Sequence, residues 1–426
     1  MRFLTDITST HKRFDKHIEY LDEITCKALP MWTYASEELL ELEYCEAFLK
    51  TWQFAGHVSD VEKPGEYFVF DLWRDSAIIM RSKDGELRAF QNVCTHRASR
   101  LLDGKGQCKS VIQCQYHAWT YNHDGSQKGI ANPNHYPECD KTEMGLNPVE
   151  LEVYRGLIFV KMLKSDCLSV KDQYAPIDEF VAAFHTEDLV AIEGSFGQEW
   201  DCNWKLAWDN YAENYHVPIG HPGLARMTRE GGEGGELSTG IGFGTWRMKI
   251  KTSKNIDEAR YQALIHTADH RVDDPVKRCW MQCSMHMNMG IEFGNEIFWA
   301  FQILPLGVDK TEIRYTPYVR KDLTELEQEL VALNIKINGS VNDEDKILVE
   351  RIQRGAKTSG YVPGQLSYIE STLALNHKRF KEIFPIAKQD EAPDWGTLKT
   401  KNEQLKSMQD KLDSKLCATG MNNESH

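Results

Sequence analysis

Two short pairs of cysteine and histidine place four metal-ligand side chains close together in the sequence. Cys94 and His96 form the pattern C-x-H, Cys114 and His117 form the pattern C-x₂-H, and seventeen residues separate the two pairs. Thiolate and imidazole donors in this number suit either a structural zinc ion or an iron–sulfur cluster in which histidine replaces cysteine on one iron. The sequence therefore predicts a four-ligand metal centre.

The order of the ligands favours the iron–sulfur cluster. Zinc sites usually pair like with like, as C-x₂-C followed by H-x₃-H, whereas each pair here supplies one thiolate and one imidazole. One iron of a [2Fe–2S] cluster then takes both sulfur ligands and the other takes both nitrogen ligands, which is the Rieske arrangement. The neutral ligands raise its reduction potential to roughly −150 to +300 mV. A Rieske cluster is the first interpretation, and a zinc site is the alternative.

A second pair of histidines follows in the other half of the chain. His216 and His221 lie five positions apart, with Pro218 and Gly220 between them. Proline and glycine end a helix, so the second imidazole can fold back beside the first. Two histidines and one carboxylate form the facial triad that holds non-haem Fe(II) with open positions for O₂ and substrate. The best candidate for the carboxylate is Asp345, in a segment with a helical pattern.

The second site has simpler interpretations. Two histidines near a helix end are, taken alone, more often a structural pair, and an aspartate in a charged run is usually solvated. The Rieske pattern favours a metal site, because a one-electron relay serves a metal that activates O₂. Asp343 and Glu344 remain substitutes for Asp345, and Leu348 and Ile352 are expected to face the core from the same helix.

The elements that must position these residues divide the chain into two parts. Residues 43–165 contain short β-rich runs cut by turn signals, which predicts an antiparallel β domain with both cysteine–histidine pairs at loop tips. Residues 1–42 and 166–426 have a mixed α+β pattern, which predicts an antiparallel sheet flanked by helices. In the second part we expect strands at 244–251, 281–293, 297–304 and 312–320, helices at 204–215, 323–333 and 343–354, and a polar tail or partner-docking helix at 396–426.

Composition narrows the class of protein. A chain of 426 residues is long enough for two domains. Lys and Arg number 50 and Asp and Glu 64, for a net charge of −14, which disfavours nucleic acid and anionic membranes as partners. We find no signal peptide and no run near the ~20 apolar residues of a membrane span, so we expect a cytoplasmic protein with reduced thiols. No glycine-rich dinucleotide fingerprint is present, so electrons from NAD(P)H must come from a separate reductase.

Taken together, these motifs resemble those of the Rieske non-haem iron oxygenases, specifically of their large catalytic α subunit. The resemblance runs from Trp32 to about Phe384. Any one motif alone is weak evidence, but five stand in the family's order: Cys94-x-His96-Arg97, Cys114-x₂-His117-x-Trp119, Asn203-Trp204-Lys205, Glu213-x₂-His216-x₄-His221 and Glu344-Asp345.

The resemblance implies a Rieske β domain inserted into a catalytic domain whose sheet holds the iron. It also implies a homotrimer, with or without a small β subunit, in which the cluster of one subunit serves the iron of its neighbour. Electrons then arrive from the reductase, with or without a ferredoxin. Glu213 is implied to bridge the two metal sites, where most members carry Asp; a helix-surface carboxylate is the alternative. Asn210 matches an Asn near the iron, either as a weak ligand or as a polar packing residue.

The substrate is less well defined by the sequence. Strands 281–293 and 297–304 are rich in aromatic and Met side chains, which suit an aromatic ring or a quaternary ammonium group. The pattern from Tyr215 onward resembles the α-only monooxygenase and demethylase branches. We expect hydroxylation or oxidative demethylation of a small aromatic or N-methylated compound. The alternatives are a ring cis-dihydroxylating dioxygenase and a Rieske electron-transfer protein without oxygenase chemistry. Arg226 and Arg229 offer a site for a substrate carboxylate, although exposed loop cations usually serve no such role.

Overall fold

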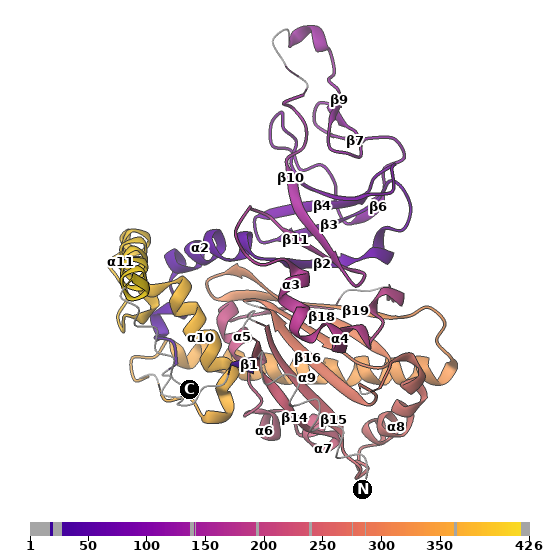
Figure 1. Ribbon diagram of the computed structural model, residues 1–426, viewed down its shortest axis with the longest axis vertical. Coiled ribbons are helices and arrows are strands. Elements are labelled where there is room, and N and C mark those ends of the chain that lie inside the picture. Colours follow the sequence, from indigo (N-terminus) through magenta and orange to yellow (C-terminus); the bar gives the residue numbers. More distant parts are fainter. Residues whose placement is uncertain are drawn as a thin grey trace.

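Two antiparallel β regions, one above the other in Figure 1, make up most of the molecule. The computed structural model describes residues 18–19, 28–136, 140, 142–192, 196–237, 241–274, 276–285, 287–361 and 364–418. The smaller, purple to magenta region holds the cysteine–histidine loops, and the larger region holds the second histidine pair. The α+β class and the antiparallel architecture expected from the sequence are confirmed.

The smaller region is built from a seven-stranded and a three-stranded sheet. The larger of these has the order β2-β11-β10-β5-β4-β3-β6, and every strand pair in both sheets is antiparallel. The strands are β2 (Gln53–His57), β3 (Glu66–Leu72), β4 (Asp75–Arg81), β5 (Leu87–Gln91), β6 (Lys105–Gln107), β7 (Ile112–Gln113), β8 (Thr120–Tyr121), β9 (Gln127–Gly129), β10 (Pro148–Tyr154) and β11 (Leu157–Lys161).

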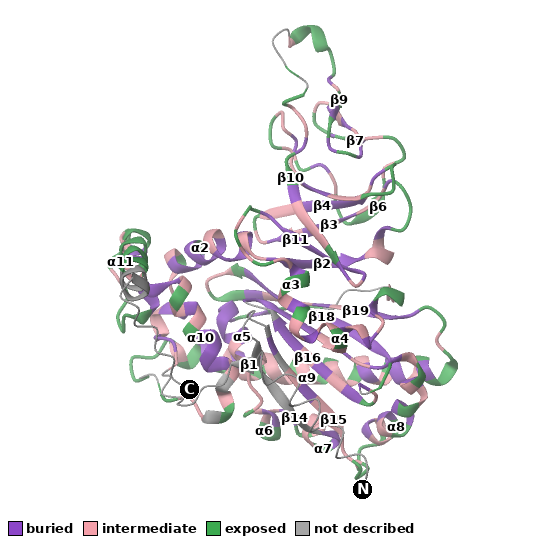
Figure 2. Cartoon of the chain, in the orientation of Figure 1, coloured by how far each residue is buried: buried purple, intermediate pink, exposed green. Residues whose placement is uncertain are grey.

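The larger region contains a nine-stranded antiparallel sheet of order β1-β14-β15-β16-β17-β18-β19-β12, in which β13 also pairs with β19. Its strands β16, β17 and β18 are mostly buried, as Figure 2 shows for β16 and β18. The strands are β1 (Ile18–Glu19), β12 (Leu189–Ala191), β13 (Phe196–Trp200), β14 (Thr228–Leu237), β15 (Ile241–Met248), β16 (Cys279–Met285), β17 (Met289–Phe293), β18 (Ile297–Gly307) and β19 (Lys310–Arg320).

Helices complete both regions and cover the large sheet. Helix α5 contacts both β18 and α9, and the short helices α6 and α7 also contact α9. Among the described residues, no helix combines the length and the hydrophobicity that a bilayer span requires. The α-helices are α2 (Glu37–Glu46), α3 (Val170–Tyr174), α4 (Asp178–Ala182), α5 (Trp204–Tyr211), α6 (Val217–Gly220), α7 (Pro222–Met227), α8 (Ile256–Leu264), α9 (Glu325–Ala356), α10 (Ser371–Ile383) and α11 (Leu398–Ala418).

Helix α9 replaces the two separate helices that the sequence predicts at 323–333 and 343–354. The intervening residues include Asn and Gly, which are weak helix formers, but packing overrides this preference. Asn334 is buried, donates to Glu296 at 2.8 Å and accepts from the Trp299 indole at 3.0 Å. The expectation that Ile352 faces the core is wrong, because its side chain is 48 % exposed. Near this end of α9 the neighbouring residue Gln353 takes the buried position instead. One continuous helix therefore carries Asp345 into the site.

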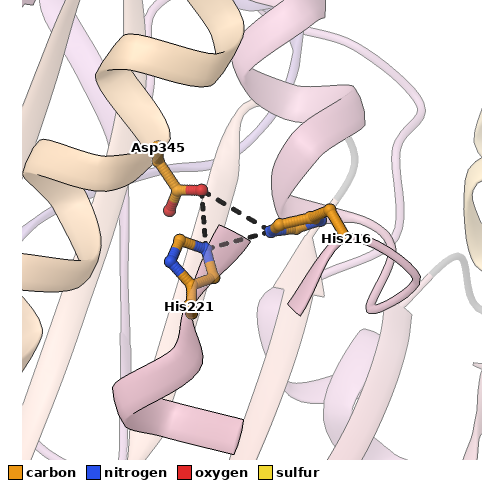
Figure 3. Close-up of side chains that lie close together, drawn as sticks. All are labelled: His216, His221 and Asp345. Carbon is orange, nitrogen blue, oxygen red and sulfur yellow. Dashed lines mark hydrogen bonds and ion pairs between the residues drawn. The ribbon is translucent and has the colours of Figure 1, made fainter. Parts of the chain in front are cut away.

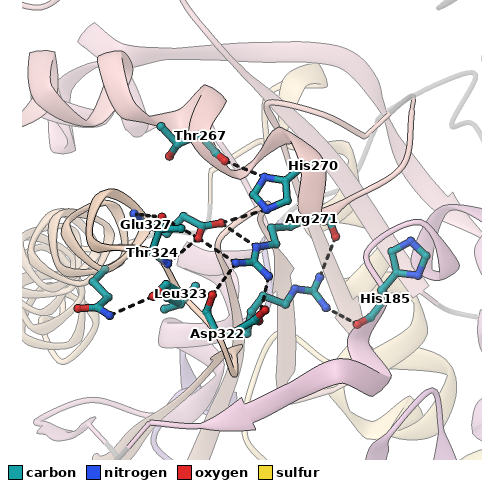
Figure 4. Close-up of polar contacts among 10 residues, drawn as sticks. His185, Thr267, His270, Arg271, Asp322, Leu323, Thr324 and Glu327 are labelled. Carbon is teal, nitrogen blue, oxygen red and sulfur yellow. Dashed lines mark hydrogen bonds and ion pairs between the residues drawn. The ribbon is translucent and has the colours of Figure 1, made fainter.

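The start of α9 is fixed by a network of charged and polar side chains (Figure 4). Thr324 and Glu327 form a capping box, in which each side chain binds the backbone amide of the other residue. Arg271 donates to both carboxylate oxygens of Glu327, at 2.7 and 2.9 Å, and to Asp322 at 3.0 Å. This network fixes the position at which α9 starts.

Two other local expectations need correction. The strand expected at 281–293 is divided into β16 and β17, which pair as a hairpin. Helix α5 ends at Tyr211 instead of residue 215, because the Glu213 side chain binds the next backbone amides, including His216 N–H at 3.2 Å. The described part of the tail is helical, which is one of the two alternatives expected for 396–426, and a partner-docking role for it stays a prediction. It forms α11, where Leu398 is buried and Asn402 accepts from the amide of Ile386 at 3.2 Å.

Candidate metal centres

The two cysteine–histidine loops adopt the same turn. Cys94 follows β5, and Cys114 follows β7. In each loop the amide four residues on, that of Ala98 or Ala118, donates to the cysteine carbonyl at 3.0 Å. Both alanines have a φ of 55°, a left-handed conformation that costs energy in a residue with a Cβ. Two strained turns of the same shape therefore present the four candidate ligands.

The candidate cysteines are buried, and the candidate histidine rings lie against each other. Cys94 and Cys114 are buried, with 3 % and 2 % of their surface exposed. The rings of His96 and His117 are 4.7 Å apart between centroids, and His96 stacks on Trp119 at 4.7 Å with the planes 5° apart. The stack fixes the orientation of one imidazole, and both rings face the same space.

The donor set suits a [2Fe–2S] cluster with two imidazole ligands. The Nδ1 atom of His117 is buried and has no hydrogen-bond partner among the described residues, although buried nitrogens normally have one. Burial alone raises the pKa of the Cys114 thiol, but hydrogen bonds from the amides of Tyr116 and His117 outweigh it and lower the pKa. Burial, together with His117 and Arg97, lowers the pKa of His96. A thiolate and a neutral imidazole are the forms that bind a metal.

The second histidine pair flanks a single helical turn. His216 is the N-cap of α6. His221 follows the last residue of α6 and is the N-cap of α7. Pro218 occupies the first turn of α6, where its missing N–H costs nothing. The turn brings the two Nε2 atoms to 3.0 Å from each other. The sequence-based expectation that the second imidazole folds back beside the first describes this geometry.

Asp345 reaches the same point from α9 (Figure 3). Its Oδ1 atom lies 2.8 Å from Nε2 of His221 and 3.5 Å from Nε2 of His216. Burial opposes the charged form of His216, but its hydrogen bonds with Asp345 and Glu213 outweigh burial and raise its pKa to about 9. Burial likewise opposes the charged form of Asp345, but its hydrogen bonds with the two histidines lower its pKa. Two nitrogens and one oxygen aimed at one point suit the facial triad of non-haem Fe(II).

The outer nitrogen of each histidine binds a carboxylate. Glu213 binds Nδ1 of His216, and Glu344 lies 2.9 Å from Nδ1 of His221. These contacts leave each Nε2 free to face a metal and fix the ring orientation. Asn210 donates to Oδ1 of Asp345 at 2.7 Å, so it contacts the candidate ligand directly.

The two substitutes considered for Asp345 point elsewhere. Glu344 binds the outer face of His221, a role that the sequence did not indicate. Asp343 is exposed and accepts a hydrogen bond from Gln198 at 2.8 Å. Glu213 lies beyond the end of α5 with 11 % of its side chain exposed, so it is not a helix-surface carboxylate.

The motif Asn203-Trp204-Lys205 positions the helix that leads to this site. Asn203 is the N-cap of α5 and accepts from the amide of Lys205 at 3.1 Å. Lys205 and the Trp204 indole both bind the buried carboxylate of Glu43, at 2.7 and 2.6 Å. Trp204 and Lys205 therefore connect α5 to α2. This connection fixes the position of α5 and so of Asn210 near its C-terminal end.

A cavity lies beside the three converging ligand atoms. Aromatic rings form much of its wall, and Asn210, Glu213, His216, His221 and Asp345 all line it. The wall residues from the sheet and α5 include Tyr211, Trp246, Trp280, Gln282, Glu292, Phe293, Trp299, Phe301 and Tyr315. Sequence reasoning anticipated the aromatic side chains but missed Glu292 and Gln282, because polar residues inside a strand normally indicate its solvent face.

Arg226, one of the two arginines considered for a substrate carboxylate, is not among the described residues that line the cavity. Arg226 forms two hydrogen bonds with Glu258, at 3.0 and 2.6 Å. The side chain of Arg229 lies outside the described residues.

Comparison with known proteins agrees with this arrangement. Residues 51–148 match the family described as Rieske [2Fe-2S] domain, and residues 180–384 match the family described as ring hydroxylating alpha subunit (catalytic domain). The carnitine monooxygenase oxygenase subunit of Acinetobacter pittii is 30 % identical over 337 residues, which cover 78 % of this chain and 86 % of that protein. The chloroplastic choline monooxygenase of Beta vulgaris is 27 % identical over 372 residues, which cover 85 % and 77 %.

A solved structure gives the same result. The quaternary ammonium Rieske monooxygenase CntA in complex with L-carnitine superimposes with a TM-score of 0.71 at 26 % identity, covering 86 % of this chain and 99 % of that one. Members of this family are O₂-dependent oxidoreductases that carry a Rieske cluster and a mononuclear iron, work with a reductase and form oligomers. The chain belongs to the Rieske non-haem iron oxygenases, as a catalytic α subunit.

Proposed function

We propose that this oxygenase hydroxylates or oxidatively demethylates a small N-methylated ammonium compound. The observation that carries the proposal is the aromatic wall of the cavity beside the three candidate iron ligands. Aromatic faces attract quaternary ammonium groups through cation–π interactions, each worth roughly 0.5–2 kcal/mol. Relatives named for carnitine and choline support the same substrate class.

In this proposal seven side chains hold the two metal groups. The cluster supplies one-electron transfer and the ferrous ion supplies O₂ activation. The proposed cluster ligands are Cys94, His96, Cys114 and His117, and the proposed iron ligands are His216, His221 and Asp345. Their support is the convergence of donor atoms and the unpartnered Nδ1 of His117.

The proposed domain division follows the same two sites. The sequence places the Rieske domain at residues 43–165 and the catalytic domain at 1–42 and 166–426, and we propose this division with one shift at the first boundary. Residue 43 lies inside α2 and its carboxylate binds Lys205, so we place the first boundary after that helix.

We propose further that electrons cross between subunits of a homotrimer. The cluster loops near β7 and the histidine pair at α6 lie at opposite ends of the molecule in Figure 1. Glu213 faces His216 from the side away from Asp345, where a second imidazole from a neighbouring cluster would complete a bridge. Exposed apolar side chains near the two sites, Tyr116 (57 % exposed) and Ile219 (88 % exposed), suit burial in such a contact. A separate NAD(P)H-dependent reductase, with or without a ferredoxin, completes the chain of transfer.

The side chains around the cavity then have separate tasks. The rings of Trp246, Trp280 and Trp299 exclude water and hold the methyl groups against the iron-facing end. Glu213 and Glu344 hold the protons on the outer nitrogens of the two histidines, which keeps the inner nitrogens directed at one point.

A substrate panel tests this function. The reconstituted holoenzyme, with a reductase and NADH, is incubated with N-methylated ammonium compounds and with aromatic acids, and O₂ consumption is compared with product formed. We expect coupled oxygenation of at least one ammonium compound and none of the aromatic acids. Formation of ring diols from aromatic compounds alone would establish the dioxygenase alternative instead.

A further inference from the structure

Among the described residues of the cavity wall, Glu292 is the one carboxylate that none of the proposed metal contacts uses. It lies on β17, directly opposite Gln282 on β16 and Trp299 on β18. Two positions earlier on the same face, Gly290 lies against Tyr211: a Cβ there would come within 2.2 Å of the Tyr211 hydroxyl. The register therefore directs Glu292 into the space between the sheet and α5, in agreement with its place in the cavity lining.

Among the residues that the structure describes, none serves this carboxylate as a counter-ion. No ion pair or hydrogen bond joins Glu292 to another of the described side chains, and its side chain is partly accessible from the cavity. Burial, with a smaller contribution from Asp345, raises its pKa to about 7. A carboxylate buried without a partner costs free energy that a cation in the cavity would recover.

The surroundings of Glu292 suit a methylated ammonium group. Trp299 lies beside it in the sheet, and Trp280 and Phe301 occupy the neighbouring rows on the same face. A carboxylate among aromatic faces combines a formal charge with cation–π attraction. Burial of methyl groups against the rings adds apolar contact.

Among its described residues, the same wall offers no cationic side chain for a substrate carboxylate. Lys and Arg are absent from the described residues that line the cavity, whereas three carboxylates line it: Glu213, Glu292 and Asp345. Arg226 is bound to Glu258. Arg247 alternates with Trp246 along β15, so it faces the other side of the sheet.

We infer that Glu292 binds the ammonium group of the substrate and that the cavity selects cations without a carboxylate, such as amino alcohols of the choline type, over zwitterionic betaines. This inference rests on the proposed function and narrows it. A zwitterion would bring its own carboxylate into a cavity that already holds three, and that repulsion gives the discrimination.

The test measures equilibrium binding to the holoenzyme by calorimetry. The probes are choline, its neutral isostere in which a quaternary carbon replaces nitrogen, and glycine betaine. We expect the wild type to bind choline at least about tenfold more tightly than either other probe. We expect Glu292→Gln to weaken choline binding roughly tenfold to a hundredfold, while binding of the neutral isostere stays unchanged.

Two further variants make the test specific. Glu312→Gln, a carboxylate change on β19 outside the cavity lining, should leave all three affinities unchanged. Gln282→Lys places a cation directly opposite Glu292. It should weaken the binding of choline and strengthen the binding of glycine betaine. This variant tests the inference by itself if Glu292→Gln does not fold.

The outcomes separate the inference from the proposed function. Equal choline affinity in the wild type and Glu292→Gln, or tighter binding of glycine betaine than choline by the wild type, would overturn the inference. Oxygenation of betaine would still leave the proposed function standing. If none of the ammonium probes binds and only aromatic compounds are oxygenated, the proposed function and the inference both fail.

Discussion

The two candidate metal centres are assembled in different ways. The cysteine–histidine loops come from one short stretch of chain, and each loop closes through its own backbone hydrogen bonds. The histidine pair, by contrast, meets a carboxylate from a distant helix: Asn210 and Asp345, which touch, are 135 positions apart. The first centre therefore depends on local turn geometry, whereas the second depends on the packing of α5, α6 and α9 against one another.

This difference implies that the two centres can be lost independently. Changes in α9 should empty the iron site and leave the cluster intact, and changes in the loop after β7 should do the reverse.

Asp345→Ala should have the largest effect on the second centre. Removing one of three ligands should lower iron content from about three atoms per chain to about two, while the visible spectrum of the cluster remains. Oxygenation should fall by at least about a hundredfold. The matched control is Asp343→Ala, two positions away on the same helix but turned toward Gln198, which should retain iron and activity. Full activity in Asp345→Ala would show that another group is the third ligand.

His117→Ala should give the opposite pattern. Without this imidazole the loop loses the donor atom that has no other partner, and we expect the brown colour and the Rieske EPR signal to disappear. About one iron atom per chain should remain at the triad. His135→Ala, an exposed histidine in the same region, is the control. Simultaneous loss of both centres in His117→Ala would contradict independent assembly.

Glu213→Gln tests the connection between the centres. The change keeps the shape but removes the charge beside His216, so metal content should stay constant while electron transfer slows by roughly tenfold to a hundredfold. The measurement is the rate at which a prereduced cluster is reoxidised by O₂ with substrate present. An unchanged rate of cluster reoxidation would show that Glu213 takes no part in electron transfer between the centres.

Glu327→Gln should have the smallest effect, and it acts through stability. Burial opposes ionisation of Glu327, but hydrogen bonds from Arg271 and Thr324 lower its pKa from 4.5 to about 2. Because the pKa of Glu327 is lower in the folded than in the unfolded protein, its charge stabilises the fold at pH values above the unfolded-state pKa of 4.5. This stabilisation is lost as the pH falls from 4.5 toward 2. The variant should be less stable by about 2 kcal/mol at pH 7, in thermal or urea unfolding. The difference in unfolding free energy between the wild type and the variant should shrink over that acidic range. A difference independent of pH would show that the charge of Glu327 does not stabilise the fold.

The sequence predicted the local centre more completely than the distant one. The spacing of Cys94, His96, Cys114 and His117 carries its own chemistry, and in the structure both cysteines are buried and the two histidine rings lie 4.7 Å apart between centroids. The pairing of His216 and His221 also follows from the proline and glycine between them. The sequence named Asp345 as the best candidate for the third ligand but left Asp343 and Glu344 as substitutes, because all three lie in one charged segment.

What the sequence missed depends on tertiary contacts. The continuity of α9 was missed because Asn334 favours a helix only once it is bonded to Glu296 and Trp299. Glu292 was missed because its significance comes from the strand register and the covering helix. The role of Glu344 was missed because it depends on which face of His221 is turned toward α9.

A single-turnover experiment tests the central claim most directly. The holoenzyme is reduced stoichiometrically, freed of reductant and reductase, and exposed to O₂ with and without choline. The account predicts that the Rieske EPR signal disappears and an oxygenated or demethylated product forms only when the ammonium compound is present. If the cluster is reoxidised without product, or stays reduced when substrate and O₂ are both supplied, the two centres do not work together as described.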